Sequence, residues 1–133
     1  MSSLAGKKAV VFGGTSGIGL AACHQLVAAG AEVVAASRDP SKAGRGELPV
    51  GIKLIQCDVR DGEALAAALA AEAPYDILIS SATGGDRAIG PFMEMDMAGY
   101  KASFDKLCEH QSCLKSTLAE NSEMLANGIR GLC

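Results

Sequence analysis

The chain has 133 residues, of which 49% are hydrophobic, 20% charged and only 4% aromatic, which fits one globular domain with an aliphatic core. Its formal net charge of −3 excludes the basic surface that nucleic-acid-binding proteins usually carry, so no DNA or RNA partner is expected. The first apolar run is too short for a signal peptide or a membrane span, and the odd number of cysteines, five, favours a reducing compartment, so the cytoplasm is the predicted location.

Strands and helices alternate along the first part of the chain. Short apolar runs predict buried parallel strands at residues 7–13, 32–37, 52–57 and 76–80. Apolar residues at helical spacing predict helices at residues 17–29 and 62–73, which stop at Gly30 and Pro74. A loop is expected over residues 39–51. The alternation predicts right-handed βαβ units and a parallel sheet with helices on both faces.

The composition changes after Leu107. All four prolines and 21 of the alanines lie in residues 1–107, whereas both asparagines and three of the five cysteines follow. We therefore divide the chain into a first unit at residues 1–107 and an atypical helical tail at residues 108–133. A helix is expected from about Ala98, and the leucine spacing allows an amphipathic helix in the tail.

A glycine-rich loop joins the first predicted strand to the first predicted helix. It reads Gly13-Gly14-Thr15-Ser16-Gly17-Ile18-Gly19. Glycine takes positive φ and lets the backbone approach a pyrophosphate, while the helix N-terminus offers N–H groups to the phosphates. Because the loop follows a strand and opens a helix, it predicts a dinucleotide site. The residues assigned to this site are Gly13, Thr15, Ser16, Gly17, Ile18 and Gly19. A tight turn without a ligand is the alternative.

This loop resembles that of the short-chain dehydrogenase/reductase family, which often reads Thr-Gly-x-x-x-Gly-Ile-Gly, with Phe12 in place of the threonine. The resemblance covers roughly residues 6–107. It implies a Rossmann-type α/β fold with a partial parallel sheet of strand order 3-2-1-4 and a ligand at the carboxyl ends of the strands. It also implies hydride transfer between a nicotinamide cofactor and an alcohol or carbonyl substrate.

The end of the second predicted strand distinguishes NAD from NADP. A carboxylate there binds both ribose hydroxyls of NAD, whereas a basic residue accepts the extra 2′-phosphate of NADP. Ser37 and Arg38 stand where NADP-using members of the family carry a hydroxyl and an arginine, so NADP is the predicted cofactor. Asp39 favours NAD if it binds a ribose, but it also suits a turn before Pro40.

Two further segments resemble cofactor contacts of the family. Asp58 and Val59 match its Asp-Val pair, in which the aspartate accepts from the adenine amino group and the valine packs on the ring. A helix-capping role for Asp58 is the alternative. Ser81 and Ala82 lie in the segment where the family reads Asn-Asn-Ala-Gly, and only Ala82 matches directly. These four residues complete the predicted cofactor site.

The catalytic residues of the family have no counterpart in this sequence. Its chemistry uses a serine and a Tyr-x-x-x-Lys pair, in which the lysine lowers the pKa of the tyrosine. Neither Tyr75 nor Tyr100 is followed by lysine at that spacing. The predicted function is therefore an NADP(H)-binding oxidoreductase-like half-domain that is catalytically incomplete and has no catalytic residues of its own. A non-catalytic nucleotide-binding or interaction module is the alternative.

The change after Leu107 has two explanations. A shifted reading frame, an alternative exon or a truncated gene is one, and a native short protein whose tail helix covers the sheet is the other. An uncovered strand edge and an apolar helix stripe predict self-association, whereas a tail that folds back to close the domain predicts a stable monomer. No metal site is expected, because the thiols and imidazole of the tail lack the Cys-x-x-Cys spacing of zinc sites. The residues considered were Cys108, His110, Cys113 and Cys133.

Overall fold

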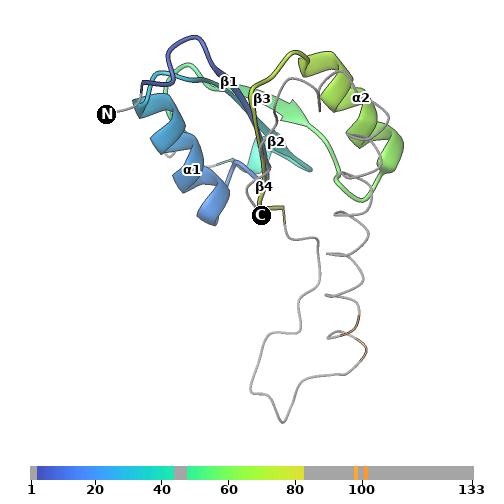
Figure 1. The fold of residues 1–133 in the computed structure, drawn as a ribbon. Coiled ribbons are helices and arrows are strands. Elements are labelled where there is room, and N and C mark those ends of the chain that lie inside the picture. Colours follow the sequence, from blue (N-terminus) through green and yellow to red (C-terminus); the bar gives the residue numbers. More distant parts are fainter. Residues whose placement is uncertain (1–2, 44–47, 83–97, 99–100, 102–133) are drawn as a thin grey trace.

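A computed structural model describes residues 3–43, 48–82, 98 and 101, and Figure 1 shows how their elements are arranged. The predicted helical tail, with the four residues considered for zinc, lies outside the described residues. So does most of the helix expected from about Ala98, of which only Ala98 and Lys101 are described, both in helical conformation. Within the described ranges, no helix is long and apolar enough to cross a membrane.

Four parallel strands form one sheet. β1 (Lys8–Phe12) is flanked by β2 (Glu32–Ser37) and β4 (Ile77–Ser80), and β3 (Lys53–Gln56) pairs with the other side of β2. The observed order β3-β2-β1-β4 confirms the predicted order 3-2-1-4. Each strand also lies within one residue of its predicted bounds, because apolar runs buried on both faces mark such strands clearly.

A helix covers each face of the sheet, as Figure 1 shows for α1 (Gly17–Ala28) and α2 (Gly62–Glu72). The side chains of each strand therefore alternate between two cores. The core beneath α2 includes Val10, Phe12, Leu65 and Leu69. The core beneath α1 includes Ala9, Val11 and Cys23. This arrangement explains why β1 is apolar along its length rather than alternating between apolar and polar residues.

Local sequence sets the helix ends. α1 stops where Gly30 takes a φ of +88°, and the Gly30 N–H donates to the carbonyl oxygen of Val27 at 2.9 Å. α2 begins after Asp61, whose Oδ1 accepts from the backbone N–H groups of Glu63 and Ala64, both at 3.1 Å. The alternative role of Asp58 as the helix cap is therefore wrong, because Asp61 caps α2.

The loop predicted over residues 39–51 contains a short 3₁₀-helix, η1 (Pro40–Lys42), which the sequence analysis did not anticipate. Proline at its first position has a φ that suits a helix start. The Asp39 side chain caps η1 by accepting from the backbone N–H of Ser41 at 3.1 Å. This turn brings Lys42 close to the end of β2.

A buried carboxylate ties the end of α2 to the amino ends of two strands. Glu72 is 3% exposed, and its Oε1 lies 2.6 Å from the Nζ of Lys53 on β3. Its Oε2 lies 3.0 Å from the Nζ of Lys8 on β1. Hydrogen bonding from Lys53 lowers the pKa of Glu72. These ion pairs lie at the amino ends of the strands, whereas the glycine-rich loop lies at their carboxyl ends.

Candidate functional site

The glycine-rich loop between β1 and α1 passes tightly against the end of β4. Gly13 has a φ of +76°, and a Cβ added there would lie 2.8 Å from the backbone nitrogen of Ala82. A Cβ on Gly19 would overlap the carbonyl oxygen of Gly13 and the Oγ of Ser81. Gly17 has a φ of +53° and nothing within 4 Å of an added Cβ. Gly13 and Gly19 therefore allow close packing, whereas Gly17 borders open space.

Ser81 fastens β4 to the start of this loop. Its backbone N–H and its Oγ both donate to the carbonyl oxygen of Phe12, each at 2.9 Å. The Phe12 side chain, which stands where the family usually has threonine, is fully buried in the core beneath α2. The loop is thus held by backbone contacts with Ser81 and by the packing of Phe12.

The first turn of α1 is suited to an anion. Ser16 is the N-cap residue, but its side chain makes no capping hydrogen bond, and the first turn contains no acidic residue. The first N–H groups of a helix have no partner within the helix, and the helix dipole adds partial positive charge at this end. The start of α1 therefore offers donors and no competing carboxylate.

A pocket of about 550 Å³ opens at the carboxyl ends of β1, β2 and β3. Three segments line it: the glycine-rich loop, the chain after β2 and the chain after β3. The lining residues are Thr15, Ser16, Ser37, Arg38, Asp39, Lys42, Asp58 and Arg60. Three cationic side chains thus face two carboxylates, and three hydroxyl groups complete the polar lining.

Each carboxylate of the pocket has a cationic partner close by in the chain. The Nε of Arg60 donates to Oδ1 of Asp58 at 3.0 Å, and its Nη2 donates to Oδ2 at 2.6 Å. These hydrogen bonds lower the pKa of Asp58 to about 2. Asp39 accepts from Ser41 and lies 3.4 Å from the Nζ of Lys42, and the Ser41 hydrogen bond is the main cause of its lowered pKa.

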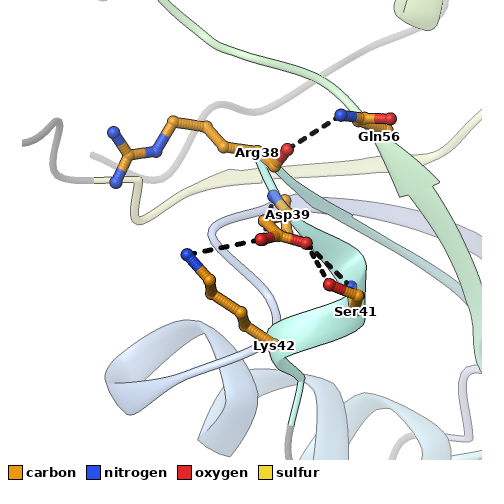
Figure 2. A network of polar contacts seen from close by, with 6 residues as sticks. Arg38, Asp39, Ser41, Lys42 and Gln56 are labelled. Atoms are coloured by element: carbon orange, nitrogen blue, oxygen red, sulfur yellow. Dashed lines mark hydrogen bonds and ion pairs between the residues drawn. The ribbon is translucent and has the colours of Figure 1, made fainter.

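Arg38 differs from the other two cations of the pocket. Its guanidinium makes no ion pair with any other residue of the described ranges, and its side chain extends away from the Asp39 carboxylate (Figure 2). Its backbone is fixed, because Gln56 Nε2 donates to the Arg38 carbonyl oxygen at 3.1 Å. The charge of Arg38 helps to lower the pKa of Asp58, but no carboxylate in the part of the chain that the structure describes forms an ion pair with its guanidinium, so this group is available to an anionic ligand.

A parallel sheet in this order, a glycine-rich loop opening the first helix and a polar pocket at the carboxyl ends of the strands define a nucleotide-binding arrangement. A family model for short chain dehydrogenases matches residues 7–120. The chain belongs to this family. The match continues past Leu107, and the division of this chain at that residue stays a prediction.

Relatives of this chain include reductases named for sugars. It is 37% identical to an L-xylulose reductase of Bos taurus over 103 residues, which are 76% of this chain and 41% of the relative. It is 30% identical to a D-erythrulose reductase of Gallus gallus over 131 residues, which are 97% of this chain and 51% of the relative. The chain therefore spans about half the length of these relatives.

Solved structures give the same result for the fold. A short chain dehydrogenase/reductase family protein superposes with a TM-score of 0.70 at 34% identity, covering 97% of this chain and 54% of that structure. The RhlG/NADP active-site complex of Pseudomonas aeruginosa has a TM-score of 0.68 at 28% identity, covering 87% of this chain and 48% of that structure. The expected Rossmann-type fold is thereby confirmed.

The predicted site residues of this chain fall into two groups. Five line the pocket: Thr15, Ser16, Ser37, Arg38 and Asp58. The others lie around it or behind it. Gly13, Gly17 and Gly19 shape the loop, and Ser81 and Ala82 pack against it. The Ile18 side chain is 83% exposed, whereas Val59 is 5% exposed and belongs to the core beneath α2.

Two cations of the pocket were missed by sequence reasoning. Lys42 and Arg60 lie three and two residues after Asp39 and Asp58, in the segments that follow β2 and β3. A signal was present, because an acidic residue followed closely by a basic one occurs after both strands. The sequence pattern does not predict that these two acid–base pairs face the same pocket.

Proposed function

We propose that this chain binds NADP(H) in the pocket at the carboxyl ends of β1, β2 and β3. The observation that carries the proposal is the contrast between the cations of the pocket. Lys42 and Arg60 each pair with a carboxylate, whereas the guanidinium of Arg38 has no such partner among the described residues. A 2′-phosphate is the group that separates NADP from NAD, and a planar guanidinium binds phosphate with two parallel hydrogen bonds.

The rest of the pocket fits the adenosine end of such a cofactor. The start of α1 offers N–H groups for the pyrophosphate, and Thr15 and Ser16 add hydroxyl groups at the same place. Oδ1 of Asp58 accepts from both the backbone N–H and the Nε of Arg60, whereas Oδ2 accepts from Nη2 and keeps a second lone pair for the adenine amino group. Val59 is 5% exposed and belongs to the core beneath α2.

The proposal extends to the reaction class of the family. When bound, a nicotinamide cofactor accepts a hydride from an alcohol or supplies a hydride to a carbonyl compound. The reductases among the relatives favour a polyhydroxylated carbonyl compound as the substrate class of this site. We propose that the 133-residue chain binds this cofactor without completing the reaction, since it contains no Tyr-x-x-x-Lys pair.

Calorimetric titration with NADPH and NADH tests the cofactor assignment. The unaltered chain is expected to bind NADPH about tenfold more tightly or better, because a charge-assisted contact to phosphate is lost with NADH. Arg38→Ala should remove the difference by weakening NADPH alone. Lys7→Ala is the matched control, because it deletes an exposed cation at the opposite edge of the sheet. Equal affinities in the unaltered chain would contradict the NADP assignment.

A nucleotide-binding module without catalysis is the second candidate, and one structural observation favours it. Tyr75 is only 7% exposed, sits in the core beneath α2, and precedes β4 at the edge of the sheet opposite the pocket. Burial raises its pKa, the reverse of what a proton-donating tyrosine in this family needs. Tyr75 therefore serves packing rather than proton transfer.

A further inference from the structure

Asp39 is the one acidic residue directly after β2, within reach of the pocket that the proposed function assigns to NADP(H). A carboxylate at this end of a strand is what NAD-binding proteins use to hold the two ribose hydroxyls. A carboxylate also repels the 2′-phosphate of NADP. The presence of Asp39 next to Arg38 therefore sets two opposing preferences side by side in one pocket.

Local contacts occupy both oxygens of this carboxylate, as Figure 2 shows. Oδ1 accepts from the backbone N–H of Ser41 at 3.1 Å and from its hydroxyl group. Oδ2 lies 3.4 Å from the Nζ of Lys42. The side chain thus caps η1 and pairs with a cation that η1 itself provides.

The backbone directs Arg38 and Asp39 to different sides. Gln56 on β3 holds the Arg38 carbonyl oxygen, and the Asp39 N–H donates to the Oγ of Ser37 at 3.3 Å. Arg38 lies in the bend that follows β2, and Asp39 is the N-cap residue of η1. Figure 2 accordingly shows the guanidinium on one side of the chain and the carboxylate turned toward η1 on the other.

We propose that Ser41 and Lys42 are positioning residues that set cofactor specificity, by holding the Asp39 carboxylate in the η1 cap and away from the ribose. This inference rests on the proposed NADP(H) site. It explains why the Asp39 carboxylate, next to Arg38, does not reverse the preference of the pocket for NADP over NAD. In the capped position Oδ1 accepts two hydrogen bonds from Ser41 and the carboxylate is turned toward η1, which keeps it from the ribose diol, and Lys42 offsets the negative charge that would oppose a phosphate.

The test uses the intact 133-residue chain with Ser41→Ala and Lys42→Met combined, titrated with NADPH and NADH. The double variant removes the Ser41 hydroxyl group and the Lys42 ammonium group, so that only the backbone N–H of residue 41 still holds the Asp39 carboxylate; NADH should then bind more tightly and NADPH more weakly. We expect the ratio of the two dissociation constants to shift about tenfold toward NADH, the effect of one charged hydrogen-bonding group. Adding Asp39→Ala to the double variant should abolish the gain for NADH.

A matched control changes the same residue types at the opposite edge of the sheet. Ser3→Ala combined with Lys7→Met removes an exposed hydroxyl and an exposed cation away from the pocket, and should leave the ratio unchanged. Thermal melts monitored by circular dichroism verify that each variant is folded. A gain in NADH affinity is diagnostic, because loss of structure weakens both nucleotides.

The outcomes separate this inference from the function on which it rests. A chain that prefers NADPH, but whose double variant keeps that preference, overturns the role of Ser41 and Lys42 and leaves the proposed function standing. Weaker NADPH binding without a gain for NADH means that Lys42 contacts the phosphate directly, which also overturns the positioning role. A chain without any preference for NADPH overturns both.

Discussion

Gly17 and Gly19 stand two positions apart in one loop, yet an added methyl group meets different surroundings at each. At Gly19 it would overlap the carbonyl oxygen of Gly13, a backbone atom that has no rotamer to change. At Gly17 it would point into open space at the start of α1, where the only local penalty is the φ of +53°. One glycine is needed for the packing of helix against strand, and the other leaves room for a ligand.

This difference predicts opposite phenotypes for two alanine variants. Gly19→Ala should lower the free energy of unfolding by about 3 kcal/mol or more, the upper part of the range for overpacked sites. Gly17→Ala should cost only about 1 kcal/mol from backbone strain but weaken the binding of both nucleotides, since the methyl group enters the space proposed for the pyrophosphate. Denaturant unfolding and calorimetry measure the two effects. A Gly17→Ala chain that binds nucleotide normally would contradict the placement of the pyrophosphate.

At this scale the sequence predicted residue types better than residue roles. The glycine spacing indicated a loop of the right kind, but spacing alone does not tell a packing glycine such as Gly13 from one that borders a ligand. Asp39 illustrates the same limit, since binding a ribose and forming a turn before Pro40 were both compatible with its position. Only the contacts with Ser41 and Lys42 distinguish them in this structure, and they place the side chain in the turn.

Among the elements, α2 is fixed to the sheet at its C-terminal end by a carboxylate shared between two strands. Glu72 accepts from Lys53 on β3 and pairs with Lys8 on β1, while it is almost completely buried. Breaking such a contact leaves desolvated groups without partners, which costs more than the contact contributes when intact. The shared carboxylate therefore ties together the helix and the amino ends of both strands.

Glu72→Gln is expected to lower the free energy of unfolding at neutral pH by about 1–3 kcal/mol. The pKa of Glu72 is lowered in the folded chain, so its contribution is present above the unfolded value of 4.5 and is lost as the pH falls through the folded value. The midpoint of thermal unfolding should therefore fall less steeply below pH 4.5 in the variant than in the unaltered chain. Glu63→Gln, on the exposed first turn of α2, is the control. Parallel pH profiles for the unaltered chain and Glu72→Gln would count against this role.

The elements themselves were largely predictable from the sequence, for a physical reason. Strands buried on both faces and helices with defined ends leave strong local signals, so their bounds fall within one residue of the predicted ones. The 3₁₀-helix η1 left a weaker signal, because three residues have no periodicity to detect. Its start at Pro40 was visible, but the capping contact that makes it a helix depends on the position of the Asp39 side chain.

For the whole molecule, family membership and sheet order were accessible from the sequence, whereas several properties of the complete surface were not. Self-association, the cytoplasmic location and the division of the chain at Leu107 stay predictions. Self-association depends on which apolar surfaces and strand edges the whole chain leaves exposed. The local sequence pattern does not predict this exposure, because the exposure of a surface depends on which other parts of the molecule pack against it.

Both candidate functions predict that the 133-residue chain does not complete hydride transfer to a substrate. The pocket proposed for the cofactor lies at the carboxyl ends of three strands. Tyr75 lies in the core beneath α2, near the amino end of β4. The sequence contains no Tyr-x-x-x-Lys pair to transfer a proton.

The chain should therefore bind NADPH yet oxidise the cofactor with carbonyl substrates no faster than a Gly17→Val variant in which nucleotide binding is impaired. The measurement is the loss of NADPH absorbance with a panel of sugars, ketones and aldehydes. Reproducible turnover that Gly17→Val lacks would show that another group of this chain donates the proton, and Ser81, next to the loop at the end of β4, would be the first residue to replace.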